Sequence, residues 1–210
     1  MDLHTAGHKR GVAAAPHRLA AEAGRDILGE GGNALEAMIA MAATVAAVYP
    51  HMNHIGGDGF WLVREPSGRV RAIMAAGPAG ANATLAFYKE RQRDEIPARG
   101  PLAALTVPGA IGGWIKAHEG AKSLGGRLPL DMLLMAAAKH AREGYTVTRS
   151  QARLSEEKLG ELKDVPGFAA QFLPEGKPPK IGDVLKQTAL AATFDQLANA
   201  GLDDLSLIHI

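Results

Sequence analysis

Seven residues that could bind a ligand or shape its pocket lie close together between Tyr49 and Phe60. Their imidazole and carboxamide groups donate and accept hydrogen bonds, their carboxylate adds one formal charge, and their glycines permit positive φ and close approach of a ligand to the backbone. They are His51, Asn53, His54, Gly56, Gly57, Asp58 and Gly59. We predict that this segment, the glycine loop, forms the wall of a substrate pocket. A structural turn whose glycines only relieve strain is the alternative reading of these residues alone.

The two histidines of the glycine loop do not predict a metal site. His51 and His54 lack further ligands at a suitable spacing and lack a helical register. The chain has no cysteine, which removes disulfides, thiolate nucleophiles and cysteine-ligated metals together. We therefore expect neither a metal nor a cofactor.

An apolar helix and a hairpin are predicted on the two sides of the glycine loop. The helix, over 34–48, contains Glu36 as its one charged residue and follows Asn33, a good N-cap residue. Because it is apolar on nearly every face, it should be buried on several sides, and it is too short to cross a bilayer. The strands, over 60–64 and 70–74, flank a Pro-Ser-Gly turn. A helical layer covering a sheet would bury both elements.

The rest of the chain predicts mainly helices. Apolar periodicity, caps and glycine stops place them over 19–28, 84–93, 110–123, 131–143, 151–162 and 188–200. Short strands are expected over 11–15 and 105–107, and a loop over 174–182. We expect Asp131 to cap its helix and Trp114 to be an anchor of the core.

Composition indicates a globular protein with one sizeable core. The chain has 210 residues, 47% of them hydrophobic, and a formal net charge of +1. No basic stripe is present, so nucleic acid is not an expected partner. The first residues contain no apolar signal segment and no membrane span is expected, so we predict a cytoplasmic location. A periplasmic or secreted location is the alternative if an upstream signal is missing.

Several ordered motifs resemble the γ-glutamyltransferase (γ-glutamyltranspeptidase) family of N-terminal-nucleophile hydrolases. Each motif is weak alone, but their order and spacing extend from Gly11 to Gly201. They are the segments 12–17, 31–34, 55–60, 107–109, 113–114, 141–144 and 190–193.

This resemblance implies an αββα sandwich and a proenzyme that cuts itself to expose a threonine nucleophile at the start of a small subunit. The acyl-enzyme then passes to water or to an amine. The nucleophile is expected beyond this chain, so residues 11–204 would be an incomplete part of the large subunit, inactive and poorly soluble alone. Residues 205–210 resemble translated sequencing adapter and are expected to be a non-native tail.

The substrate is expected to be a small amide or a γ-glutamyl compound. Relatives that act on γ-glutamyl substrates carry an arginine in the loop after the second hairpin strand, whereas residues 74–83 here contain none. The variant loop resembles oxamate amidohydrolases, whose shorter acid would not need that clamp. Arg99 is a possible replacement anion-binding residue, with a surface arginine as the alternative. A non-catalytic homologue serving in binding or assembly is the alternative to an enzyme.

Overall fold

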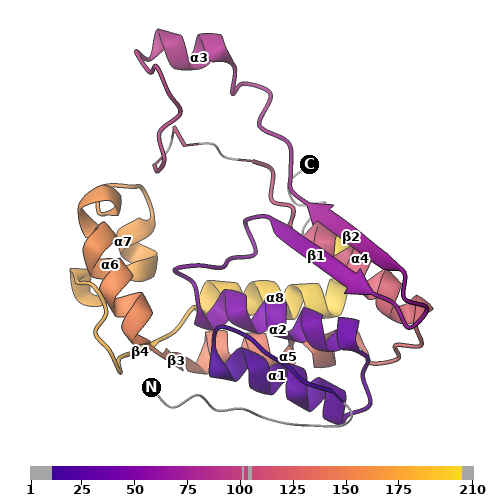
Figure 1. The fold of residues 1–210 in the computed structure, drawn as a ribbon. Helices are drawn as coiled ribbons and strands as arrows, with labels where there is room; N and C mark the ends of the chain where they lie inside the picture. The colour runs from indigo at the N-terminus through magenta and orange to yellow at the C-terminus, as the bar shows by residue number, and fades with distance from the viewer. Residues whose placement is uncertain (1–10, 101, 104–105, 205–210) are drawn as a thin grey trace.

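The computed structural model describes residues 11–100, 102–103 and 106–204 (Figure 1). Its long helices are α1 (Arg18–Gly29), α2 (Ala34–Val48), α4 (Ala110–Ser123), α5 (Leu130–Glu143), α6 (Arg149–Leu162) and α8 (Thr188–Ala200). Its short helices are α3 (Leu85–Glu90), α7 (Phe168–Phe172) and the 3-10 turn η1 (Pro174–Gly176). Its strands are β1 (Gly59–Arg64), β2 (Val70–Ala75), β3 (Tyr145–Thr146) and β4 (Val184–Leu185).

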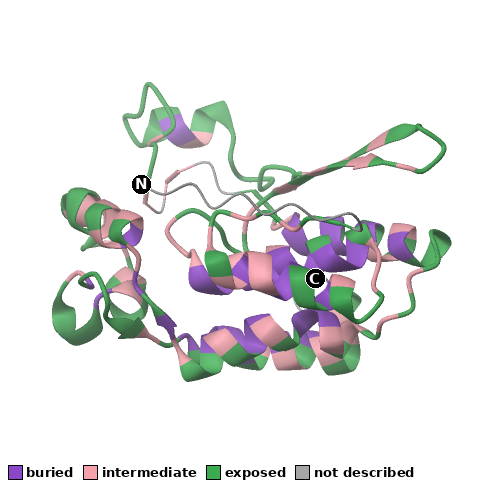
Figure 2. Ribbon diagram, turned by 60° about the horizontal axis from the view of Figure 1, so that its bottom comes forward, coloured by how far each residue is buried: buried purple, intermediate pink, exposed green. Residues whose placement is uncertain are grey.

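Helix α2 lies at the centre of the helical layer. It packs against α1, α4 and α5, and α5 packs in turn against α8. Figure 2 shows buried residues concentrated on these helices. Because α2 carries many alanines, its neighbours can approach from several sides, and most of its residues are buried. One stripe is not, since Ala34 and Met38 are exposed and Ala42 and Val45 are only half-buried. The prediction that this helix is buried on several sides is confirmed.

Strands β1 and β2 form an antiparallel hairpin, with register from Gly59 opposite Ala75 to Arg64 opposite Val70. The inner side chains pack against the helical core, among them Trp61 and Ile73. The outer side chains Phe60, Leu62 and Met74 are 71%, 79% and 79% exposed. The described residues thus form one helical layer and part of one sheet, as an incomplete αββα sandwich requires.

The core joins helices that are distant in sequence. Trp114 of α4 is 4% exposed, and its ring stacks on Phe194 of α8 with centroids 6.5 Å apart. The prediction of a core tryptophan is confirmed. Tyr145 and Val147, just after α5, are also buried.

Two predicted strands are not present as strands. Residues 11–15 form none, and Ala13 instead packs near Gly24 of α1. A strand needs a ladder partner, and the described residues provide none beside this segment. The strand expected over 105–107 is reduced to a single antiparallel bridge between Ala79 and Thr106, and residue 105 lies outside the described residues.

Three details of the helices also differ from the predictions. Asp131 is not a cap, because α5 begins one residue earlier, after Pro129. Helix α3 ends early, and Gln92 just beyond it has a positive φ of 54°. Helix α6 begins two residues before the predicted start, because Thr148 accepts a hydrogen bond from the backbone N–H of Gln151. Helix α7 and the β3–β4 pair were not predicted from the sequence.

The predicted non-native tail, 205–210, lies outside the described residues. Among those that are described, no helix combines the length and apolarity needed to cross a membrane.

Candidate active site

The glycine loop runs from the end of α2 to the start of β1. The carbonyl of Tyr49 accepts hydrogen bonds from the N–H groups of Met52 and Asn53, each 3.1 Å long. Ile55 is 7% exposed and belongs to the core. The loop is therefore held by its own backbone and by one buried side chain.

The glycine loop meets two other segments at a place that we call the glycine junction, made of Gly57, Asp58, Gly77 and Gly109. The carbonyl of Gly57 accepts hydrogen bonds from the N–H groups of Gly109 (3.0 Å) and Ala110 (2.9 Å), where α4 begins. The Asp58 carboxylate accepts a 3.3 Å hydrogen bond from the N–H of Gly77, just after β2. Its Oδ1 atom also lies 3.4 Å from the donating Thr106 hydroxyl. Asp58 thus links the three segments.

Close backbone packing makes Gly77 and Gly109 the positions in the junction that require glycine. A Cβ atom at Gly77 would lie 2.6 Å from the carbonyl carbon of Val107, and one at Gly109 would lie 2.7 Å from that of Ala75. Real Cβ atoms essentially never approach heavy atoms within 3.0 Å. This role was not predicted from the sequence, although the Gly77-Pro78 and Pro108-Gly109 pairs indicated turns at both places.

The glycines predicted to shape the pocket differ from Gly77 and Gly109. Gly56, Gly57 and Gly59 do not use the positive φ that glycine permits. The N–H of Gly56 donates to Nδ1 of His54 at 3.0 Å, so this amide is not bare. The loop bends through ordinary backbone regions because its hydrogen bonds to Tyr49 and to α4 already fix its course.

The structure divides the other predicted site residues between two cavities. The first, which we call the loop cavity, has a volume of about 470 Å³ and lies between residues 14–16, α2 and β1. Asn53, His54, Asp58 and Gly59 line it. The second, the α6–α7 cavity, has a volume of about 210 Å³ and is lined in part by His51 and Arg99. Gly56 and Gly57 line neither of them.

Arg99 forms an ion pair instead of facing the loop cavity. Its Nε atom lies 3.3 Å from Oε2 of Glu161 on α6, and the Lys158 ammonium lies 2.6 Å from the other oxygen. The hydrogen bond from Lys158 is the main cause that lowers the pKa of Glu161. Arg99 and Lys158 therefore share one carboxylate. In the described residues, no group of three or more His, Asp or Glu side chains could hold a metal ion.

Burial lowers the pKa values of the histidines around the glycine loop and so favours their neutral forms. It lowers the pKa of His54, and it lowers that of His51 together with the nearby positive charge that His17 would carry. The rings of Tyr49 and His51 lie 4.1 Å apart, and those of Tyr49 and His17 lie 6.4 Å apart. Tyr49 therefore connects the start of α1 to the glycine loop.

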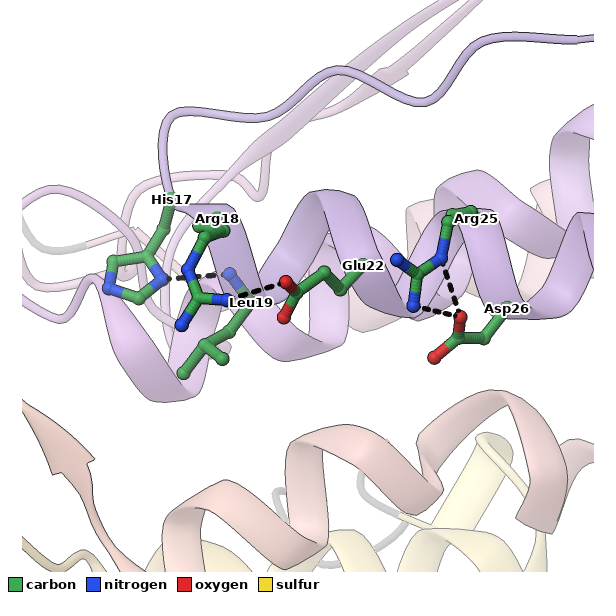
Figure 3. A network of polar contacts seen from close by, with 6 residues as sticks. All are labelled: His17, Arg18, Leu19, Glu22, Arg25 and Asp26. Atoms are coloured by element: carbon green, nitrogen blue, oxygen red, sulfur yellow. Dashed lines mark hydrogen bonds and ion pairs between the residues drawn. The ribbon is translucent and has the colours of Figure 1, made fainter. Parts of the chain in front are cut away.

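His17 caps α1 through an acceptor nitrogen. Figure 3 shows its ring beside the N–H of Leu19, which donates to Nδ1 at 3.2 Å, and the Arg18–Glu22 ion pair on the next turn. Burial, then the charges of His140 and Arg18, lower the pKa of His17, while Glu22 acts in the opposite direction. A protonated Nδ1 could no longer accept the capping hydrogen bond.

We predict that acid destabilises the protein in part through His17. Its pKa is lowered from 6.5 by folding, so its contribution is complete above pH 6.5 and is lost as the pH falls below that value. As the pH is lowered, the urea concentration at the unfolding midpoint should fall less steeply for His17→Ser than for the parent protein. The serine keeps a capping acceptor that does not titrate. The other buried histidines supply the remaining slope. Equal slopes for the two proteins would contradict the role of His17.

Comparison with known proteins decides the family. The family model described as gamma-glutamyltranspeptidase matches residues 20–205. This range includes the glycine junction and the lining of both cavities, apart from residues 14–16 of the loop cavity. The chain belongs to the gamma-glutamyltranspeptidase family. The family resemblance found in the sequence is confirmed.

Relatives with different named activities are similar to this chain. The oxamate amidohydrolase proenzyme of Klebsiella pneumoniae subsp. pneumoniae is 49% identical over 92% of this chain and 36% of its own length. The glutathione hydrolase proenzyme of Escherichia coli K12 is 31% identical over 96% of this chain and 35% of its own length. The chain therefore spans about a third of the length of these curated relatives.

The fold is similar to that of solved family members. The crystal structure of Helicobacter pylori gamma-glutamyltranspeptidase matches with a TM-score of 0.85 and 28% identity, over 95% of this chain and 57% of that chain. The predicted fold class is confirmed.

Proposed function

We propose that this chain is part of the large subunit of a self-processing amide hydrolase or acyltransferase that acts on a short amide of the oxamate type. The observation that carries the proposal is the 49% identity to an oxamate amidohydrolase proenzyme, against 31% to a glutathione hydrolase. The absence of arginine from residues 74–83 agrees with it, because no bidentate clamp is available there for a glutamyl α-carboxylate.

The loop cavity is the proposed substrate side of the site. Asn53 and His54 supply neutral hydrogen-bonding groups at its wall, and Asp58 supplies the charge that fixes the glycine junction. The pKa of His54 is lowered by burial, which favours its uncharged imidazole. Its Nδ1 atom already accepts the Gly56 N–H, so Nε2 carries the proton and can donate to a substrate. The rest of the lining is mostly apolar, so these few polar groups would orient a small amide within the cavity.

The nucleophile is proposed to come from polypeptide that this chain does not span. A threonine exposed by autoproteolysis would attack the amide carbonyl with its hydroxyl, while its own α-amine carries the proton to the leaving amine. Water or an amine would then release the acyl group. The glycine junction would hold the large-subunit wall rigid while the acyl-enzyme forms and breaks.

The outer face of the hairpin supports this division between two subunits. Phe60, Leu62 and Met74 leave an apolar surface on the face of the hairpin opposite to Trp61 and Ile73. Burying apolar surface contributes about 25 cal/mol per Å², so an exposed face of this kind favours a covering layer. We propose that the small subunit provides that layer. A cytoplasmic location stays a prediction.

Substrate choice by the full-length processed protein tests the proposal. We expect kcat/KM for ammonia release from oxamate to exceed that for a γ-glutamyl anilide at least tenfold, since a missing charge-assisted contact costs about 1.5–3 kcal/mol. Replacement of the threonine at the processing site should abolish both self-cleavage and turnover. A preference for the anilide would overturn the short-amide assignment, and self-cleavage without turnover of either compound would remove the substrate proposal.

A further inference from the structure

The α6–α7 cavity is a second space that the proposed amide chemistry does not use. It lies between the start of the glycine loop, Arg99, α6 and α7, with a volume of about 210 Å³. Phe168 and Phe172 of α7, whose ring centroids are 5.4 Å apart, form an aromatic part of its wall. This cavity shares no lining residue with the loop cavity.

Two of its lining residues carry buried polar atoms without partners. Gln151 is 2% exposed, and its Nε2 donates to the Tyr145 hydroxyl at 3.0 Å. Among the residues that the structure describes, its Oε1 atom has no hydrogen-bond partner, and neither ring nitrogen of His51 has one. Buried polar groups are almost always paired, and leaving one unpaired costs stability. Both residues line the cavity, but these atoms have almost no accessible surface, so a guest would reach the amide acceptor and the imidazole only by displacing the side chains that cover them.

The cavity also carries an excess of positive charge. Arg99 and Lys158 line it and share the single carboxylate of Glu161. Arg153 and Glu157, elsewhere on α6, pair with each other and do not line the cavity. One positive charge is thus left at the rim, where a carboxylate would be favoured.

We propose that the α6–α7 cavity binds a small flat carboxylate that also carries an N–H donor. The carboxylate would lie near Arg99 and Lys158, the N–H would donate to Oε1 of Gln151, and the flat body would pack against Phe168 and Phe172. At about 30 Å³ for each water, the cavity holds the equivalent of roughly seven waters, which limits the guest to about ten non-hydrogen atoms. The site is distinct from the loop cavity and does not depend on the proposed reaction.

Three probes test this proposal, and two of them each lack one functional group of the first. Calorimetric titration of the full-length protein with 4-aminobenzoate should give a dissociation constant below about 1 mM, as small compact ligands can reach. Benzoate lacks the N–H donor and aniline lacks the carboxylate, and each should bind at least tenfold more weakly. Equal affinity for all three probes would overturn the proposal.

Matched variants locate the binding. Arg99→Gln and Lys158→Gln should each weaken 4-aminobenzoate about tenfold and leave aniline unchanged, whereas Arg153→Gln on the same helix should change neither. Unfolding midpoints within about 2 °C of the parent protein would show that the fold is kept, as expected for exposed ion pairs. Binding that is unaffected by Arg99→Gln and Lys158→Gln, or that oxamate displaces by competition, would contradict a separate site.

Discussion

Gly77→Ala is expected to destabilise the protein by about 3 kcal/mol and to lower kcat/KM of the processed enzyme at least tenfold. The new Cβ would overlap the backbone carbonyl group of Val107, which no side-chain rotation can relieve. The loop after β2 must then move, and the hydrogen bond from the Gly77 N–H to Asp58 is lost. Urea unfolding and steady-state kinetics on the proposed amide substrate measure the two effects.

Gly80→Ala is the matched control for that variant. Gly80 lies in the same loop, has no positive φ, and a Cβ there would meet nothing within 4 Å. Its unfolding free energy should stay within about 0.5 kcal/mol of the parent protein, with unchanged kinetics. If both variants behave alike, the junction does not depend on close approach at Gly77.

Glu36→Ala is expected to lower the free energy of unfolding by about 4 kcal/mol. Glu36 is 1% exposed, and its two carboxylate oxygens accept 2.8 Å hydrogen bonds from the N–H groups of Asn33 and Leu128. Hydrogen bonds to a charged group contribute about 1.5–3 kcal/mol each, and alanine would leave both buried donors unpaired. The link to Leu128 also holds the segment before α5 against the start of α2.

Glu36→Gln and Glu30→Ala separate the causes of that loss. Glutamine keeps one acceptor oxygen but turns an N–H group toward the other donor. Glu36→Gln should therefore recover less than half of the unfolding free energy that Glu36→Ala loses. Glu30 is exposed at the end of α1, and its replacement should change the unfolding free energy by less than about 0.5 kcal/mol. A loss below about 1 kcal/mol for Glu36→Ala would contradict the role of this carboxylate.

The elements beside the glycine loop could be predicted because their signals are local. Asn33 with Glu36 forms the capping box that starts α2, and that helix covers the predicted range. The turn at Gly68, with a φ of 88°, joins the predicted hairpin strands. Caps, glycine stops and apolar periodicity act within a few residues, so the sequence shows them directly.

The missed elements depend on contacts between distant segments. Residues 11–15 have the composition of a strand, but a strand exists only where a partner supplies its hydrogen bonds. Strand β3 pairs with β4 across a separation of about forty residues, with Tyr145 opposite Leu185. Two residues in each strand give no recognisable pattern, so only the folded chain shows the pair.

The division of the site was also decided by the tertiary structure. Sequence proximity grouped His51 with His54, whereas the fold places His51 with Arg99 beside α6 and α7, and His54 on the loop cavity. The requirement for glycine at positions 77 and 109 comes from backbone segments that meet only after folding.

The sequence by itself determined the family, the helical layer and the position of the glycine loop. These follow from the order of short motifs along the chain and from apolar spacing, both of which are present in the sequence before any tertiary contact forms. The tertiary structure decided which glycines must lack a side chain, which polar groups share a cavity and which face of the hairpin stays uncovered. Those properties depend on distances between remote segments, and packing of the whole chain sets such distances.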